Sequence, residues 1–380
     1  MRVDMSIEEL RESFEDFSDH LPDHRTGNNK RYSVEEILFL TLTSVLCGAE
    51  GWRDIERFGK AKLEFLRTVF PFKSGVPSDD TLRRFFRALD PKAFGHCFVN
   101  WAKTITLPDQ AHIAIDGKVS RHTFDGGGNP LHMVTAFASD CRLVLGQEKV
   151  ADKSNEIKAI PHLLEVLDLE GAIVTIDAMG CQRDIAQAIV EKKADYVLSL
   201  KGNQGTLHKD VELIFKDKDL MKELIIDQAD TVDGSEHGRL EKRHYRSINC
   251  PEVLKKQQAW PYLQSLVEVV SYREIKGVAS EETRYYITSL APVAAKIGRA
   301  IRAHWAIENS LHWILDMSFR DDDSRIRRGN APQNIAVIKH MALNMLQKAK
   351  GKRDSIKQLR KAAGWENAQL IKILQQIALI

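Results

Sequence analysis

The sequence predicts an α/β protein built on a mixed β-sheet, with an all-helical region before the sheet. Helix caps and amphipathic periodicity run through residues 1–105. Three short β-branched segments follow between residues 112 and 150, and helical and strand-like segments then alternate up to residue 202. This order is expected when strands lie side by side in one sheet and helices cover its faces.

Residues 1–105 predict a helical N-terminal domain. Ser33 and Glu36 form a capping box that satisfies the first free backbone donors, and an apolar run to residue 46 follows. A second amphipathic stretch covers about 52–70, and Ser78 is placed to cap a third helix over 79–90. This third helix is basic, which leaves two interpretations open: a DNA-binding helix-turn-helix, or a helical bundle with a solvated face formed by Arg83, Arg84 and Arg87.

Residues 106–228 predict the first part of the α/β core. Strands are expected at 112–117, 131–139 and 142–150, and the sequence DGGGNP at 125–130 is a hairpin signal between the first two. A helix at 154–168, with Ser154 in the cap position, a strand at 172–177, a helix at 181–194 and a strand at 195–202 come next. The charged segment 203–228 is expected to be helical.

The remaining residues divide into three parts. Strand-like stretches between 229 and 292 predict a β-rich insertion. Helices at about 294–317 and 331–346 complete the core within 293–347. Residues 348–380 are expected to form a basic C-terminal tail, because 348–363 contains seven basic residues and the single acid Asp354. A solvated tail and a contact with DNA phosphates both remain possible for this stretch.

Composition excludes several classes of protein. The 380 residues carry 55 Lys and Arg against 53 Asp and Glu, a net charge of +2, so any contact with a polyanion must come from local patches. Five widely spaced cysteines fit neither a disulfide framework nor a CxxC zinc knuckle, and suit a reducing compartment. The acidic N-terminus and the absence of an apolar run of about 18 residues predict a cytoplasmic protein that does not span a membrane.

Two aspartates close predicted strands of the core. Asp116 follows the first strand in AIDG, and Asp177 follows the fourth strand in TIDAMG. Because open α/β sheets bind ligands at the carboxyl ends of strands, two acids there indicate a divalent cation. The alternative is that Asp177 only caps a helix beginning near Gly180.

A third acid lies on a helix with an unusual polar face. His304, Glu308, His312 and Asp316 recur at steps of four residues and share one side of an otherwise apolar helix. A zinc site is one interpretation, but HExxH is absent and the spacing is not a zincin pattern. The other interpretation is that a carboxylate of this face, Glu308 or the alternative Asp316, completes a two-metal site for phosphoryl transfer.

Four blocks in order resemble one known family. They are AIDGKVSRHT, TIDAMGCQRDIA, LKGNQG, and HWAIENSLHWILDMSFRDDDSRIRRGNAPQNIAVIKHMALNML, with the β-rich insertion before the last. This pattern is similar to the H-repeat-associated transposases, a branch of bacterial insertion-sequence transposases. The resemblance implies an RNase H-like catalytic core and a DDE triad, which corresponds to Asp116, Asp177 and Glu308 here.

The resemblance also implies the cofactor and partners. We expect two Mg²⁺ ions, for which Mn²⁺ can substitute, held by the three acids. The DNA partner is double-stranded, with terminal inverted repeats, and joining two ends implies a dimer in the DNA complex. The wider cut-and-paste group carries Tyr, Arg, Glu and Lys across the glutamate helix, whereas this chain has Ile301, His304, Glu308 and Leu315. We therefore expect His304 and His312 to take over phosphate contacts.

Further basic residues are candidates for contacts with the DNA backbone. They lie just beyond two predicted strand ends or after the acidic run 321–323, and are Lys118, Lys201, Arg325, Arg327 and Arg328. Ordinary surface salt bridges with the acidic run are the alternative. Two other functions also stay open: a transposase-derived DNA-binding protein without catalytic activity, and a general metal-dependent nuclease or phosphatase on the same fold.

Overall fold

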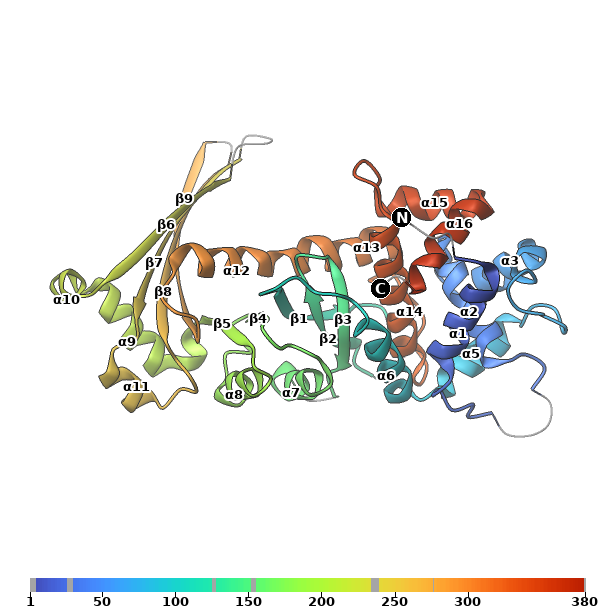
Figure 1. Ribbon diagram of the computed structural model, residues 1–380, viewed down its shortest axis with the longest axis horizontal. Coiled ribbons are helices and arrows are strands. Elements are labelled where there is room, and N and C mark those ends of the chain that lie inside the picture. Colours follow the sequence, from blue (N-terminus) through green and yellow to red (C-terminus); the bar gives the residue numbers. More distant parts are fainter. Residues whose placement is uncertain are drawn as a thin grey trace.

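Within the residues that the structure describes, a nine-stranded mixed sheet extends from the centre of the molecule to its left end in Figure 1. The computed structural model describes residues 5–25, 30–124, 128–151, 155–233, 239–275 and 277–378. The strands lie in the order β3-β2-β1-β4-β5-β9-β8-β7-β6. Their bounds are β1 His112–Ser120, β2 Leu131–Ala138, β3 Leu143–Lys149, β4 Ile173–Ile176, β5 Asp195–Leu200, β6 Ile226–Asp233, β7 Arg239–Asn249, β8 Ser265–Ile275 and β9 Val278–Thr288.

The half of the sheet that comes first in the chain has the predicted mixed topology. β1, β2 and β3 form an antiparallel meander, and β4 and β5 add to β1 in parallel. Helices α7 (Glu156–Val166) and α8 (Arg183–Glu191) make the crossovers and pack on one face. Residues 125–127 of the expected hairpin and the cap residue Ser154 lie outside the described residues. The predicted alternation of helix and strand is confirmed.

The segment predicted to be a β-rich insertion continues the same sheet. β9 pairs antiparallel with β5, and β8, β7 and β6 follow in a long meander. The charged segment after β5 is helical as expected but ends early, because β6 already begins at Ile226. The remaining helices of this part are η1 Gly202–Gln204, α9 Gly205–Lys216, α10 Lys218–Glu223 and α11 Glu252–Gln258.

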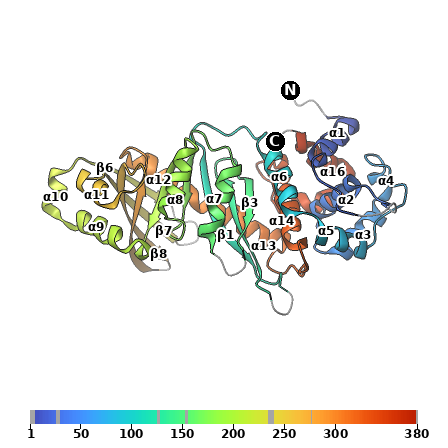
Figure 2. The same cartoon turned by 90° about the horizontal axis from the view of Figure 1, so that it is seen from below.

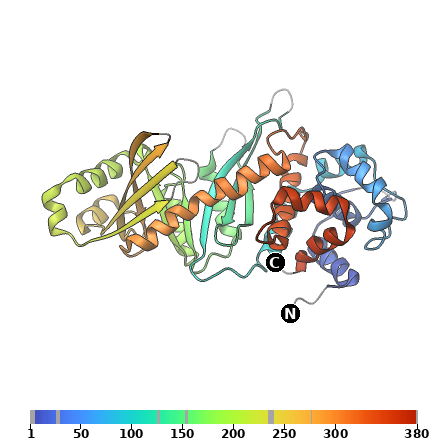
Figure 3. The same cartoon turned by 90° about the horizontal axis from the view of Figure 1, so that it is seen from above.

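One long helical rod crosses the other face of the sheet (Figure 3). It consists of α12 (Ala294–Ile307), a five-residue π-helix, η3 (Glu308–His312), and α13 (Trp313–Phe319). The predicted helix over about 294–317 is confirmed, but the sequence pattern did not predict its π segment. In that segment the N–H of Trp313 donates to the carbonyl of Glu308, five residues earlier.

Helices fill the described N-terminal part of the chain (Figure 2). The capping box of Ser33 and Glu36 opens the almost entirely buried α2, and Ser78 caps the third predicted helix, which is α5. Arg83 and Arg84 pair with acids one turn earlier in α5. The helices are α1 Ile7–Ser18, α2 Val34–Leu46, α3 Trp52–Ala61, α4 Leu63–Leu66, α5 Asp79–Ala88 and α6 Pro91–Ala102.

The C-terminal residues are not a free basic tail. After α14 (Ala331–Ala349), helices α15 (Ile356–Trp365) and α16 (Asn367–Leu374) and the turn η4 (Gln375–Ala378) pack against α1, α2 and α14. Arg360 is buried, donates to the carbonyl of Val45 and lies over the ring of Phe319. The prediction of a tail was wrong because apolar residues at helical spacing, including Leu359 and Ala363, give this basic segment a buried face.

The chain has no disulfide among its cysteines, all five of which are free thiols. None of the helices in the described parts combines the length and the apolar character that crossing a bilayer requires.

Candidate active site

Asp116 lies in the middle of β1. The prediction that this residue ends its strand is wrong, because β1 continues to Ser120. It is the neighbouring strand that ends: the last pair between β1 and β4 is Ile115 with Ile176, whereas Asp116 still pairs with Thr135 on β2. Asp116 therefore sits where β1 loses one neighbour, and its side chain is only 16% exposed.

Asp177 directly follows β4, as predicted. Its Oδ1 accepts the backbone N–H groups of Met179, at 3.0 Å, and Gly180, at 3.3 Å. The interpretation of Asp177 as the cap of a helix starting near Gly180 is wrong, because α8 begins at Arg183 with Gln182 in the cap position. The carboxylate instead fixes the turn after β4 through one oxygen, and the residue stays half-buried.

The polar face of the α12–η3–α13 rod is turned toward β1 and β4. The Nδ1 atom of His304 lies 2.9 Å from the hydroxyl of Thr175 on β4. Nδ1 of His312 lies 3.5 Å from Oε2 of Glu308 and 3.7 Å from Oδ2 of Asp116. The predicted common face is therefore present, and its last member, Asp316, forms an ion pair instead of joining the cluster.

The pKa values of the two facing carboxyl groups are shifted in opposite directions. Burial raises the pKa of Asp116, and the nearby carboxylate of Glu308 raises it further. The imidazole of His312 lowers the pKa of Glu308, whose side chain is 52% exposed. The pair therefore favours one proton on Asp116 and a negative charge on Glu308. Burial also lowers the pKa of His304, so this imidazole is favoured in its neutral form.

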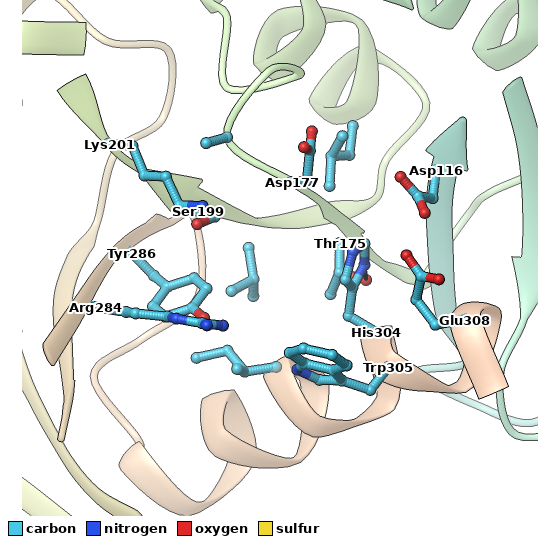
Figure 4. A pocket seen from close by; sticks show the side chains of 14 residues that line it. Asp116, Thr175, Asp177, Ser199, Lys201, Arg284, Tyr286, His304, Trp305 and Glu308 are labelled. Carbon is cyan, nitrogen blue, oxygen red and sulfur yellow. Dashed lines mark hydrogen bonds between the residues drawn. The ribbon is translucent and has the colours of Figure 1, made fainter. Parts of the chain in front are cut away.

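Asp116, Asp177 and Glu308 open onto one cavity of about 290 Å³ (Figure 4). Lys201 and Arg284 bring positive charge to the same cavity, from the end of β5 and from β9. The full lining comprises Asp116, Thr175, Ile176, Asp177, Ala178, Val197, Ser199, Lys201, Arg284, Tyr286, Ile301, His304, Trp305 and Glu308. Acids and bases in one concave space can hold cations and a phosphate group together.

The donor set fits a divalent cation. Asp116 and Glu308 each offer a carboxylate oxygen and His312 a ring nitrogen, and these three atoms all lie within 4.8 Å of one another. Asp177 belongs to the same cavity but not to this tight group. Carboxylate oxygens are the ligands that Mg²⁺ and Mn²⁺ prefer, so the residues present can accommodate such an ion.

The predicted basic residues differ in their surroundings. Lys118 is 12% exposed and pairs with Asp316 at 2.7 Å and with Asp322 at 3.5 Å. Arg327 donates to the carbonyl of His122 and lies over the ring of Phe124. Lys201 lines the cavity, and Arg325 and Arg328 are exposed. Lys118 therefore forms the salt bridges of the alternative interpretation, whereas Arg325 and Arg328 are exposed and accessible to a polyanion.

Sequence patterns missed several cavity residues. Arg284 and Tyr286 come from β9 of the insertion and reach the cavity only because β9 pairs with β5. Trp305 is 41% exposed, and the Cζ atom of the Arg284 guanidinium lies 5.9 Å from the centroid of its ring. The only hint in the sequence was that Trp305 directly follows His304 of the polar helix face. The position of His312 next to Asp116 could not be read from spacing, because it depends on how the helix crosses the sheet.

Two family models match this chain. A family model described as "Transposase DDE domain" matches residues 107–345, and one described as "DDE_Tnp_1-associated" matches residues 15–102. The chain is 42% identical over 379 residues to "Putative transposase YncI" of Escherichia coli O157:H7, covering 97% of this chain and 95% of that protein.

A second relative points to the same family. "H repeat-associated putative transposase YhhI" of Escherichia coli (strain K12) is 39% identical over 364 residues, covering 93% of this chain and 95% of that protein. The DDE-domain match alone spans more than half of the chain. The chain therefore belongs to the H repeat-associated transposases, a family with a transposase DDE domain.

Proposed function

We propose that this protein is a DNA transposase that catalyses metal-dependent strand cleavage and strand transfer of an insertion-sequence element. Asp116, Asp177 and Glu308 are the catalytic carboxylates of the proposal. One observation carries it: three acids from separate parts of the chain line one cavity that also receives Lys201 and Arg284. Membership of a family with a DDE domain supports the same assignment.

The architecture is consistent with an RNase H-like core. The strand order β3-β2-β1-β4-β5, with β1 antiparallel to β2 and parallel to β4, supports this proposal. In the proposal, residues 106–228 and 293–347 form the core and 229–292 the insertion. Residues 1–105 form a helical domain with a DNA-binding role, to which the C-terminal helices contribute packing.

The three acids act as metal ligands in the proposed mechanism. Asp116, Asp177 and Glu308 would hold two divalent cations, Mg²⁺ with Mn²⁺ as a substitute, which would supply the positive charge needed to activate an attacking oxygen and stabilise a leaving oxygen. Asp116 and Glu308 converge on one side of the cavity and would hold one cation between them. The turn that fixes one oxygen of Asp177 leaves the other to face a ligand. Lys201 and Arg284 then position the scissile phosphate.

The proposed partner is duplex DNA carrying the terminal inverted repeats of the element. Joining two ends requires two copies of the protein, so we propose a dimer in the DNA complex, acting in the cytoplasm. Arg325 and Arg328 are exposed and are assigned to the phosphate backbone. Lys118, His304 and His312 are held by protein groups in this structure, so we assign them no more than an indirect effect on DNA.

A nicking assay tests the function. A supercoiled plasmid carrying the element's inverted repeats is incubated with the protein and Mg²⁺, and nicked product is measured. Asp177→Asn is expected to reduce nicking to background while DNA affinity is unchanged. Asp184→Asn is the matched control, because Asp184 is exposed and is seven residues from Asp177. We expect this control to cut at the wild-type rate.

Each other outcome identifies a different function. Equal nicking by Asp177→Asn and the wild-type protein would show that the triad is wrong. DNA binding without nicking under every metal condition would indicate a transposase-derived protein without catalytic activity. Cleavage that is independent of the inverted repeats would indicate a general metal-dependent nuclease.

A further inference from the structure

His312 is buried among the carboxylates proposed to hold the cation. The side chain is 10% exposed, and Nδ1 faces Asp116 and Glu308. The distances to their oxygens, 3.7 and 3.5 Å, are longer than the 2.7–3.2 Å of a good N–H···O hydrogen bond. The imidazole therefore approaches both acids without forming a short hydrogen bond to either one.

We propose that Nδ1 of His312 is a ligand of the cation held by Asp116 and Glu308, and that this nitrogen makes the site prefer Mn²⁺ over Mg²⁺. The inference rests on the proposed function, because it concerns the same site. It adds a nitrogen ligand to a shell that the two carboxylates alone would make entirely of oxygen.

The distances between Nδ1 of His312 and the carboxylates of Asp116 and Glu308 are compatible with coordination of one ion by all three residues. In octahedral coordination with bonds of about 2.1 Å, adjacent ligand atoms are about 3.0 Å apart and opposite ones about 4.2 Å apart. The distances from Nδ1 to the two carboxylates lie between these values, at 3.5 and 3.7 Å. Because burial holds the ring of His312, we expect rotation of the Asp116 and Glu308 side chains to bring the three donor atoms to one centre.

The backbone holds the imidazole in this position. Glu308 and His312 are the first and last residues of the π-helix η3, a deviation that is frequent at functional sites. The other ring nitrogen, Nε2, is buried and has no hydrogen-bond partner among the described residues. Coordination by Nδ1 requires the tautomer with the proton on Nε2, in which the lone pair of Nδ1 faces the carboxyl groups of Asp116 and Glu308 and can bind an ion between them.

Nitrogen ligation changes which metal the site prefers. Mg²⁺ binds oxygen ligands and dehydrates reluctantly, whereas Mn²⁺ accepts carboxylate and imidazole together. His304 provides an internal comparison, because it lies two helical turns away on the same face but contacts Thr175 and is not part of the close donor group.

Electron paramagnetic resonance of bound Mn²⁺ tests the proposal without depending on activity. The full-length protein is loaded with one equivalent of Mn²⁺, and nitrogen coupling is recorded by electron spin echo envelope modulation. We expect a directly coordinated ¹⁴N signal that changes to a ¹⁵N pattern when the protein is made with ¹⁵N-histidine. The signal should disappear in His312→Gln and persist in the matched variant His304→Gln.

Affinity gives a second measurement on the same variants. His312→Gln is expected to weaken Mn²⁺ binding by about tenfold or more, while Mg²⁺ binding changes less than about threefold. Bound Mn²⁺ without nitrogen coupling in the wild-type protein would overturn the proposal, and so would loss of the coupling in His304→Gln instead. The proposed function fails in a different way: Asp116→Asn would then leave Mn²⁺ affinity unchanged.

Discussion

Ionised Asp116 is expected to lower the free energy of unfolding of the metal-free protein. Its side chain is mostly buried and faces Glu308, and these effects raise its pKa to about 8 from the ordinary 3.8. Asp116→Asn keeps the size of the side chain and removes the titration. The variant therefore isolates the free energy of holding a catalytic carboxyl group at this point of β1.

The sign of the effect follows from proton linkage. The folded state binds a proton at Asp116 that the unfolded chain releases above pH 4, so this contribution to stability is fully present below that pH. It is lost as the pH rises through the folded pKa of about 8. At about 1.4 kcal/mol per pH unit, raising the pH from about 5.5 to about 8 costs the wild-type protein up to about 3 kcal/mol relative to the variant.

Urea denaturation followed by tryptophan fluorescence measures this difference. The free energies of unfolding of both proteins are determined in EDTA at the two pH values, with the exposed Asp184→Asn as a control. Asp116→Asn should gain stability relative to the wild type as the pH rises, and Mg²⁺ should stabilise only the wild type and the control. An equal pH dependence of wild type and Asp116→Asn would refute the raised pKa of Asp116.

Three further changes have defined outcomes. Lys339→Met leaves the buried Asp321 without the ion pair that joins them at 2.6 Å, so urea denaturation should show a loss of about 3–5 kcal/mol, partly restored by adding Asp321→Asn. Arg360→Met removes a buried donor and should cost about 1.5–3 kcal/mol of stability without weakening DNA binding in a filter assay. If the C-terminal helix instead binds DNA through this residue, affinity will fall. Alanine at both Arg325 and Arg328 should reduce the slope of log affinity against log salt by about 1.8, and an unchanged slope would exclude both from phosphate contact.

The sequence by itself determined the local features of this protein. Ser33 and Ser78 cap helices where expected, because a cap depends on residues only three positions apart. Asp177 follows its strand, since a short apolar run ending in a polar residue defines that boundary. The polar face of the glutamate helix was also predictable, because helical periodicity places residues four apart on one side.

Only the tertiary structure decided which distant segments these residues contact. Asp116 lies beside an open edge because β4 stops at Ile176, which no property of β1 itself reveals. Arg284 reaches the cavity because β9 pairs with β5 more than 80 residues away in sequence, and His312 reaches Asp116 because α12–η3–α13 crosses the sheet at one register. The basic C-terminus became a packed helix pair because an apolar face of α2 and α14 was available to cover it. These outcomes depend on contacts between distant segments, whereas the sequence pattern of one segment records only its own preferences.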